Sequence, residues 1–247
     1  MTRTILIMGS APDVIACRAI GRSQLDAIVA INNAWSVRDD WDYHIAPDDF
    51  PAERGPGPLR PGQVAIGSET YVPANNRFGG IVYAGGTMAF TAGYWALDAL
   101  RPSAMIFAGC NMVYPPSGRT HFYGSGTADP LRQDVTLRNL EAKSARLMAH
   151  AARRGCACYR LPSAKSRTLF PPIRIEQVGV HHTAPLAVDE DRFAAVIEAE
   201  KRAQYFVESG RYWDEQDQFS TEQIDRIDAL WLQAVQTHPP VTASQEV

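Results

Sequence analysis

Short apolar runs that end in polar or glycine-containing turns recur between residues 4 and 161 of the chain. The clearest are Thr4–Met8, Asp26–Asn33, Asp42–Pro47, Ala104–Asn111 and Cys156–Leu161, with a weaker run at Gln63–Ser68. Apolar runs of this length, bounded by turn residues, are typical of strands that are buried on both faces of a parallel sheet. We therefore predict a parallel β-sheet built from these segments.

Segments with helical periodicity lie between the later strands. We predict one helix at Thr87–Leu100 and a second from Asp134, as its N-terminal cap, to near Arg154. Strands that alternate with helices indicate an α/β fold in three layers with right-handed crossovers. The predicted domain covers residues 1–172.

Two amphipathic helices are predicted after the sheet, at about Asp189–Ser209 and Ser220–Gln236. The apolar stripe of the first is interrupted by Glu200. We assign residues 173–247 to a C-terminal helical extension with a frayed tail from His238. The extension is expected to cover the sheet, to cap the site or to form a contact between copies in a homo-oligomer.

Composition and charge narrow the functional classes. The 247 residues carry a formal net charge of -3, so no basic field favours a nucleic-acid partner. No apolar run has the length to span a bilayer, and the first run lacks a signal-peptide cleavage site, so we expect a cytoplasmic protein. Four cysteines without a CxxC pair predict neither a zinc site nor a disulfide framework.

Polar loops follow two of the predicted strands, at the edge of the sheet where open α/β folds bind their ligands. In the first loop, Gly9–Asp13, Ser10 and the amides after it can donate hydrogen bonds to an anion, although a plain turn is an equal alternative. In the second, Asn32 and Asn33 can read a base edge or a sugar hydroxyl, or can cap a local turn.

A third loop, Gly85-Gly86-Thr87, opens the predicted helix at Thr87–Leu100. The N-terminus of a helix is suited to bind a phosphate. The three loops and the residues after the strong strand predict a nucleotide site. Its predicted members are Gly9, Ser10, Asp13, Asn32, Asn33, Gly85, Gly86, Thr87, Asn111 and Tyr114.

A long loop rich in Gly, Pro, Ser and Thr is predicted at residues 112–132, and loops of this length are often functional. His121 has the ordinary pKa of a general base near neutral pH, whereas a surface histidine with a hydrogen bond is the alternative. Arginine and tyrosine side chains stabilise phosphate charge. The predicted catalytic residues are His121, Arg119, Tyr123 and Ser125.

Two further pairs of polar residues are candidates for a metal site. His181 and His182 are adjacent, so in an extended chain they point in different directions and form a poor metal pair. Asp48 and Asp49 follow the segment HIAP and resemble the metal-binding carboxylate motif of some sugar transferases, but no flanking pattern supports that function, and solvated loop carboxylates are the alternative. No metal site is predicted.

The motifs GSAPD, INN, AGGTMAFTAGYWALDALRPSAMIFAGCNM and THFYGSG occur in this order along the chain. Together they resemble the bacterial sialyltransferases of glycosyltransferase family 42 and the related sialyltransferase-like domains of unknown function, over roughly residues 4–165. The resemblance implies a modified Rossmann-like domain with a small lid. It also implies a CMP-linked sugar donor as substrate and no metal or other cofactor for the chemistry.

By this resemblance, Gly9–Asp13 contacts the nucleotide and the helix entry Ala84–Thr87 lies at the cytidine and ribose. The asparagine of the second loop is Asn32 or Asn33, and Tyr114 or Tyr123 binds the phosphate. The match departs from the family at the catalytic positions.

Ser125 stands where the family's histidine base is expected, and His121 lies four residues earlier. Asn111 takes the place of an aspartate, and Val82 takes the place of an arginine. The residues that the resemblance implies for nucleotide binding therefore match the family better than those it implies for catalysis. We expect a glycosyltransferase-like enzyme that moves a sugar to a hydroxyl acceptor. The alternatives are an inactive nucleotide-binding protein on the same fold and a metal-dependent pyrophosphokinase-like enzyme.

Overall fold

Six parallel strands form the central sheet of the computed structural model, which describes residues 3–114, 118–125, 134–179 and 186–235. They are β1 (Thr4–Met8), β2 (Ala27–Ile31), β3 (Tyr43–Ile45), β4 (Val64–Ile66), β5 (Ala104–Ala108) and β6 (Ala157–Arg160). Their spatial order is β4-β3-β2-β1-β5-β6. Every residue of β1, β2 and β5 is buried, which explains their unbroken apolar sequences. The prediction of a parallel α/β sheet is confirmed.

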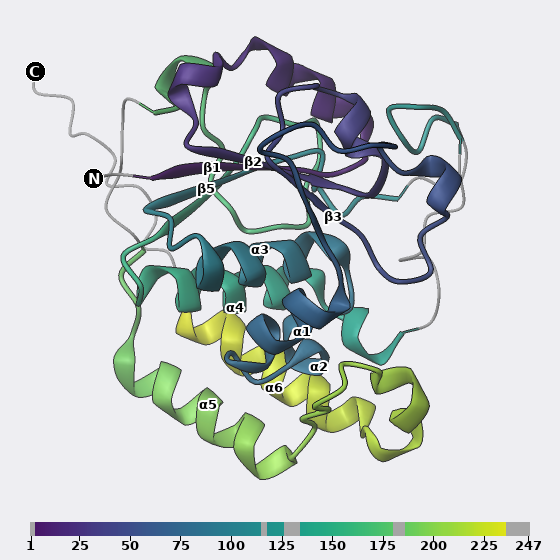
Figure 1. Cartoon of the computed structure of the whole chain (residues 1–247). Helices are drawn as coiled ribbons and strands as arrows, with labels where there is room; N and C mark the ends of the chain where they lie inside the picture. Colours follow the sequence, from purple (N-terminus) through teal and green to yellow (C-terminus); the bar gives the residue numbers. More distant parts are fainter. Residues whose placement is uncertain (1–2, 115–117, 126–133, 180–185, 236–247) are drawn as a thin grey trace, which may run out of the picture.

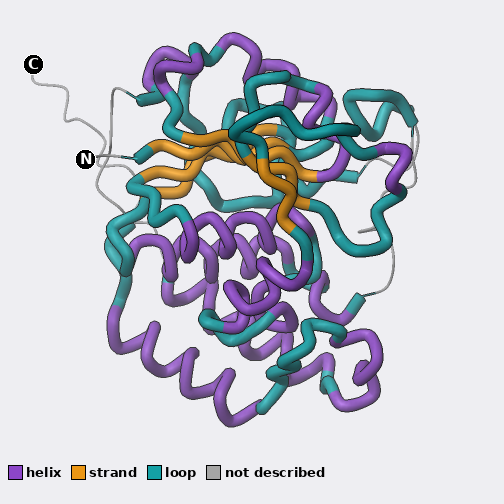
Figure 2. Tube along the Cα trace, viewed as in Figure 1, coloured by secondary structure: helices purple, strands orange, loops and turns teal. Residues whose placement is uncertain are grey.

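Helices cover one face of the sheet in two tiers (Figure 1). The inner tier contains α3 (Met88–Ala99) and α4 (Leu140–Ala152), flanked by α1 (Ser68–Asn76) and α2 (Ile81–Ala84). In the outer tier α6 (Thr221–Ala234) packs on α4, and α5 (Glu190–Ala203) packs on α6. On the other face lie loops and 3₁₀ turns that include η1 (Pro12–Ala19) (Figure 2). The fold is thus Rossmann-like in three layers, with the C-terminal helices added on one side.

Two details of the helix predictions need correction. Asp134 does not cap the long helix: it caps the short 3₁₀ turn η6 (Val135–Leu137), and Asn139 caps α4 by accepting a hydrogen bond from the Ala142 amide at 3.0 Å. The sequence reading also missed α1 and α2, because α1 contains Pro73 and α2 is a single turn. Within the described residues no helix has both the length and the apolar composition needed to cross a bilayer.

Glu200, which interrupts the apolar stripe of α5, is the centre of a buried polar network between the two helical tiers. Its two carboxylate oxygens accept hydrogen bonds from Arg146 at 2.7 and 2.8 Å, and Trp231 donates to the same carboxylate at 2.7 Å. Arg146, which is fully buried, also donates to the Tyr94 hydroxyl at 2.8 Å and to the carbonyl of Phe78. The network joins α3, α4, α5 and α6.

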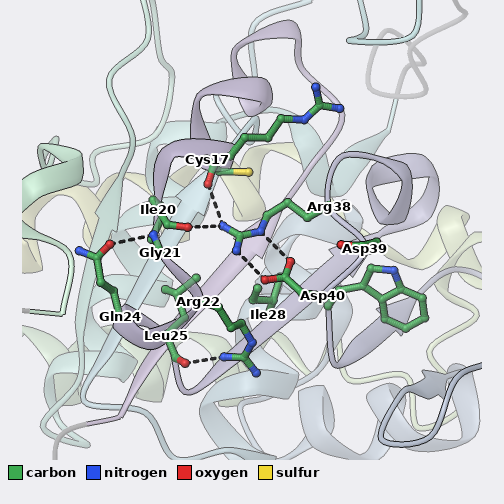
Figure 3. Close-up of polar contacts among 12 residues, drawn as sticks. Cys17, Ile20, Gly21, Arg22, Gln24, Leu25, Ile28, Arg38, Asp39 and Asp40 are labelled. Atoms are coloured by element: carbon green, nitrogen blue, oxygen red, sulfur yellow. Dashed lines mark hydrogen bonds and ion pairs between the residues drawn. The ribbon is translucent and has the colours of Figure 1, made fainter.

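A second arginine fixes the loops on the opposite face of the sheet (Figure 3). The Arg38 guanidinium donates to the carbonyls of Cys17 and Ile20 at 2.9 and 2.7 Å, and it forms an ion pair with Asp40 at 2.6 Å. These bonds tie the end of η1 to the loop between β2 and β3. The segments that follow β1 and β2 are therefore held to each other.

We expect Glu200→Gln to lower the free energy of unfolding by about 3–5 kcal/mol, because Arg146 would keep a buried charge without its counter-ion. Glu190→Gln is the matched control, since Glu190 pairs with Arg153 at 3.3 Å on the surface. The control substitution should lower the free energy of unfolding by less than about 1 kcal/mol. Urea unfolding measures both, and equal midpoints for the two variants would contradict the assignment.

Candidate functional site

A cavity of about 900 Å³ lies at the carboxyl edge of the sheet, where the loops after β1, β2 and β5 meet. The order of strands reverses at β1, which has β2 on one side and β5 on the other. Open α/β sheets bind ligands at such a reversal, and the volume is that of a small-molecule site. The predicted residues that line the cavity are Gly9, Ser10, Asn32, Asn33, Gly86, Thr87, Asn111, Tyr114, His121 and Tyr123.

Two predicted nucleotide-binding residues lie behind this lining. Asp13 accepts a hydrogen bond from the side-chain amide of Asn111 at 3.1 Å, and burial raises the pKa of its carboxyl. Gly85 has a φ of +94° in the turn between α2 and α3, where a side chain is strained. Both residues shape the lining and do not belong to it.

Two predicted catalytic residues also lie outside the lining. Arg119 donates to the backbone carbonyls of His121 and Phe122 within its own loop. The hydroxyl of Ser125 donates to the carbonyl of Gly118 at 2.8 Å. Their polar groups hold the loop in shape, so the position of His121 depends on them.

The turn after β1 is held by backbone contacts with the turn after β5. The amide of Gly9 donates to the Ala108 carbonyl at 2.8 Å, and the amide of Ala11 donates to the Gly109 carbonyl at 3.0 Å. A Cβ on Gly9 would lie 2.5 Å from the Gly109 oxygen, so only glycine allows this approach. The plain-turn alternative therefore accounts for Gly9 and Ala11, and Ser10 remains as the member able to contact a ligand.

The start of α3 keeps two backbone donors for a ligand. The Gly86 amide donates to Thr136 Oγ1 at 2.8 Å, and Thr87 caps the helix. The amides of Met88 and Ala89 donate to no residue that the structure describes, and both residues line the cavity. The donors suited to an anion are thus the first two amides of α3, which follow the glycine pair that predicted the site.

The side chain of Asn32 carries a hydrogen-bond acceptor that no donor reaches among the described residues. Its φ of +50° is unusual for a residue other than glycine, and its carbonyl accepts a hydrogen bond from His44 Nε2 at 2.9 Å. Its side-chain oxygen Oδ1 is buried and has no hydrogen-bond partner among the described residues. A buried acceptor left unpaired is costly, and because Oδ1 exposes no surface, a ligand in the cavity reaches it only after the Asn32 side chain rotates.

His121 is buried beside these loops. Its Nδ1 forms a hydrogen bond with Thr120 Oγ1 at 2.8 Å, and its ring stacks on Tyr123 with centroids 4.8 Å apart. The amide of Phe122 donates to the Ser10 carbonyl at 3.0 Å, which ties the loop to the turn after β1. Burial lowers the pKa of His121, so its imidazole is neutral at pH 7.

Part of the lining comes from segments that the sequence reading did not assign to the site. Tyr71, whose pKa is raised to about 12 by burial, contributes from α1. Residues 209–213 reach the cavity from the C-terminal extension, and a Cβ on Gly86 would lie 2.2 Å from the Tyr212 hydroxyl oxygen. The other unassigned polar members are Asp48, Asp49, Arg54, Ser68, Thr91 and Thr120. No local motif marks these residues.

Other predicted features give no site in the part of the chain that the structure describes. His181, His182 and residues 115–117 and 126–132 of the predicted long loop lie outside the described residues. Among the residues that are described, no three His, Cys, Asp or Glu side chains are grouped to hold a metal ion. All four cysteines are buried and unbonded to one another.

The chain was compared with models of protein families, with curated proteins and with solved structures, and none of them matches it.

We expect Met88→Pro to weaken the binding of a phosphate-bearing ligand roughly 10- to 100-fold, the loss of one charge-assisted hydrogen bond. Proline removes the free amide at the first helical position, where it is tolerated, and Thr87 already has the extended backbone that precedes proline. Met88→Ala keeps the amide and is the control. Calorimetry with inorganic pyrophosphate and CMP measures the effect, and equal affinities for the two variants would refute the role of this amide.

Proposed function

We propose that this protein is a glycosyltransferase-like enzyme that moves a sugar from a nucleotide-activated donor to a hydroxyl acceptor. The observation that carries the proposal is the presence of a buried His121 on the same cavity as the amides of Met88 and Ala89, which have no partner among the described residues. A base and an anion site on one cavity are the two parts that such a transfer needs. A CMP-linked donor is the first to test, since the sequence motifs resemble those of sialyltransferases.

In the proposed reaction His121 acts as the general base. With Nδ1 protonated and donating to Thr120 Oγ1, Nε2 keeps its lone pair and takes the proton of the acceptor hydroxyl. The acceptor oxygen attacks the anomeric carbon of the donor sugar, and the bond from that carbon to the phosphate oxygen breaks. The bonding electrons leave with the nucleotide. Thr120 is a positioning residue, because its contact with Nδ1 fixes the orientation of the His121 ring.

The departing phosphate carries the charge that develops in this reaction. The amides of Met88 and Ala89 lie at the positive end of the α3 dipole, where they stabilise such a charge without rearrangement. On the same cavity, Asn32 borders the base or ribose, and a rotation of its side chain would bring Oδ1 to a donor there. These contacts use groups that the protein itself leaves unpaired.

Phosphate transfer with a divalent metal is the second candidate, and Asp48 and Asp49 favour it because both line the cavity. The Asp48 carboxylate accepts a hydrogen bond from Ser68 Oγ at 2.7 Å. Carboxylates with bound phosphates are the usual ligands of Mg²⁺. In this case the ligand would be a di- or triphosphate, and its binding would require the metal.

A thermal-shift screen separates the candidates. We expect CMP to stabilise the purified protein without Mg²⁺, by about 2.7 kcal/mol at one hundred times its dissociation constant. UMP, GMP, AMP and the corresponding diphosphates complete the panel, each with and without Mg²⁺. A shift seen only with Mg²⁺ and a diphosphate would favour phosphate transfer. A CMP shift without turnover of any CMP-sugar would indicate an inactive binding protein, and no shift at all would overturn the proposal.

We expect His121→Gln to reduce turnover by about 10²- to 10⁴-fold while CMP binding remains, because glutamine has no basic nitrogen. Burial lowers the pKa of His121, so the wild-type rate should stay level down to a pH below 6.5 and should fall only as His121 becomes protonated. The variant should lose this acidic limb. A variant that keeps the wild-type pH profile would assign the base to another group.

A further inference from the structure

A chain of hydrogen bonds connects the C-terminal extension to the turn that precedes α3. Tyr212, the first residue of η8 (Tyr212–Gln218), is buried, and its hydroxyl donates to one oxygen of the Asp134 carboxylate at 2.6 Å. The other oxygen of Asp134 accepts from the hydroxyl of Thr136 at 2.7 Å and from its amide at 2.8 Å. Thr136 Oγ1 in turn accepts from the Gly86 amide at 2.8 Å. Three segments that are distant in the sequence are thereby joined at Gly86.

Gly86 is also enclosed by direct packing. A Cβ at this position would lie 2.2 Å from the Tyr212 hydroxyl oxygen and 3.0 Å from Thr136 Oγ1. Thr136 is fully buried and Tyr212 is 3% exposed, so both sides of the enclosure belong to the packed interior. Within the turn itself, the Thr87 amide donates to the Gly85 carbonyl at 2.8 Å. A turn that is held in this way has one orientation, and the directions of the amides that follow it are set with it.

The segment that carries Tyr212 is fixed to the rest of the protein on its other side. Just before it in the chain, the carbonyl of Glu208 accepts a hydrogen bond from the side-chain amide of Asn76 in α1 at 2.8 Å. Just after it, the Trp213 ring meets the Tyr212 ring edge to face, with centroids 5.4 Å apart. The Tyr212 hydroxyl is therefore presented to Gly86 by a packed wall of the cavity, and little conformational entropy is lost when a ligand binds.

We infer that Tyr212 is a positioning residue for the anion site at the start of α3. Through the hydrogen-bond chain it fixes the Gly86 peptide, and with it the directions of the Met88 and Ala89 amides. Donors that are fixed before binding stabilise an anion without rearrangement. Tyr212 thus acts through the backbone of the turn and not by contact with the phosphate. The inference rests on the anion site of the proposed function and does not require the transfer of a sugar.

Calorimetry with inorganic pyrophosphate and the full-length protein tests the inference. Tyr212→Phe removes the hydroxyl and keeps the ring, and we expect it to weaken pyrophosphate binding about tenfold, because the turn before α3 loses a support. Tyr205→Phe is the matched control. The Tyr205 hydroxyl lies in the same extension and is bonded to Gln223 and to the Ser220 amide, each at 3.0 Å, and Tyr205 does not line the cavity.

Both tyrosine variants should lower the melting temperature, since each loses hydrogen bonds of a buried residue. Only Tyr212→Phe should weaken pyrophosphate binding, and the control should keep the wild-type affinity to within about twofold. Equal affinities for the two variants, or no binding of pyrophosphate to the wild type, would overturn the inference.

Thr136 provides a second pair of variants at the other end of the hydrogen-bond chain. Thr136→Val removes the hydroxyl that accepts from the Gly86 amide, and Thr136→Ser keeps it. We expect the valine variant to weaken pyrophosphate binding about as much as Tyr212→Phe does, and the serine variant to restore most of the affinity. Equal affinities for valine and serine would contradict the role of this hydrogen bond.

A double-mutant cycle with Met88→Pro separates positioning from direct contact with the ligand. Because Tyr212 is inferred to act through the first amides of α3, Tyr212→Phe should weaken binding less than about threefold when the Met88 amide is already absent. A loss of about tenfold in that background would show that the hydroxyl acts elsewhere in the cavity, and it would overturn the inference.

The inference and the proposed function can fail separately. Pyrophosphate binding that depends on Tyr212, in a protein that turns over no CMP-sugar, would support the positioning role and refute sugar transfer. Turnover of a CMP-sugar, with pyrophosphate binding that is the same in Tyr212→Phe and the wild type, would support the proposed function and overturn the positioning role.

Discussion

The close approach of the turns after β1 and β5 is the constraint on which the cavity depends. Gly9 and Gly109 meet backbone to backbone, since a Cβ on Gly9 would lie 2.5 Å from the Gly109 oxygen and one on Gly109 would lie 2.6 Å from Val14 Cβ. With these turns in contact, the strand order reverses at β1 and leaves room at the carboxyl edge of the sheet. The loop that carries His121 is then bonded to the same turn through Ser10.

The buried network around Glu200 extends this arrangement to the C-terminal helices. The backbone carbonyl of Glu200 accepts a hydrogen bond from the Tyr83 hydroxyl at 2.7 Å, and the Tyr205 amide donates to that hydroxyl at 2.9 Å. The outer tier is thereby fixed to α2 close to the start of α3. Residues 209–213 follow directly, so an interaction deep between the helices decides where one wall of the cavity lies.

The groups available to a ligand are those that the scaffold leaves unpaired. Several predicted binding residues use their polar atoms in hydrogen bonds within the protein. Asp13 accepts one from Asn111, and the Gly86 amide donates one to Thr136. The amides of Met88 and Ala89 have no such partner among the described residues. The proposed chemistry follows from this division, because donors already bonded within the protein would have to break those bonds to hold a phosphate.

The sequence by itself determined the parallel sheet, the helices α3 and α4, and most loops of the site. Fully buried strands need unbroken apolar runs, and the ligand edge of such a sheet lies where those runs end. Only the tertiary structure decided which polar atoms remain free there, because Thr136 and Tyr212 reach Gly86 from elsewhere in the chain. The same holds for Trp213, since nothing in the sequence around it differs from an ordinary surface turn. Its place on the cavity results from the packing of α4, α5 and α6, a long-range interaction that no local pattern encodes.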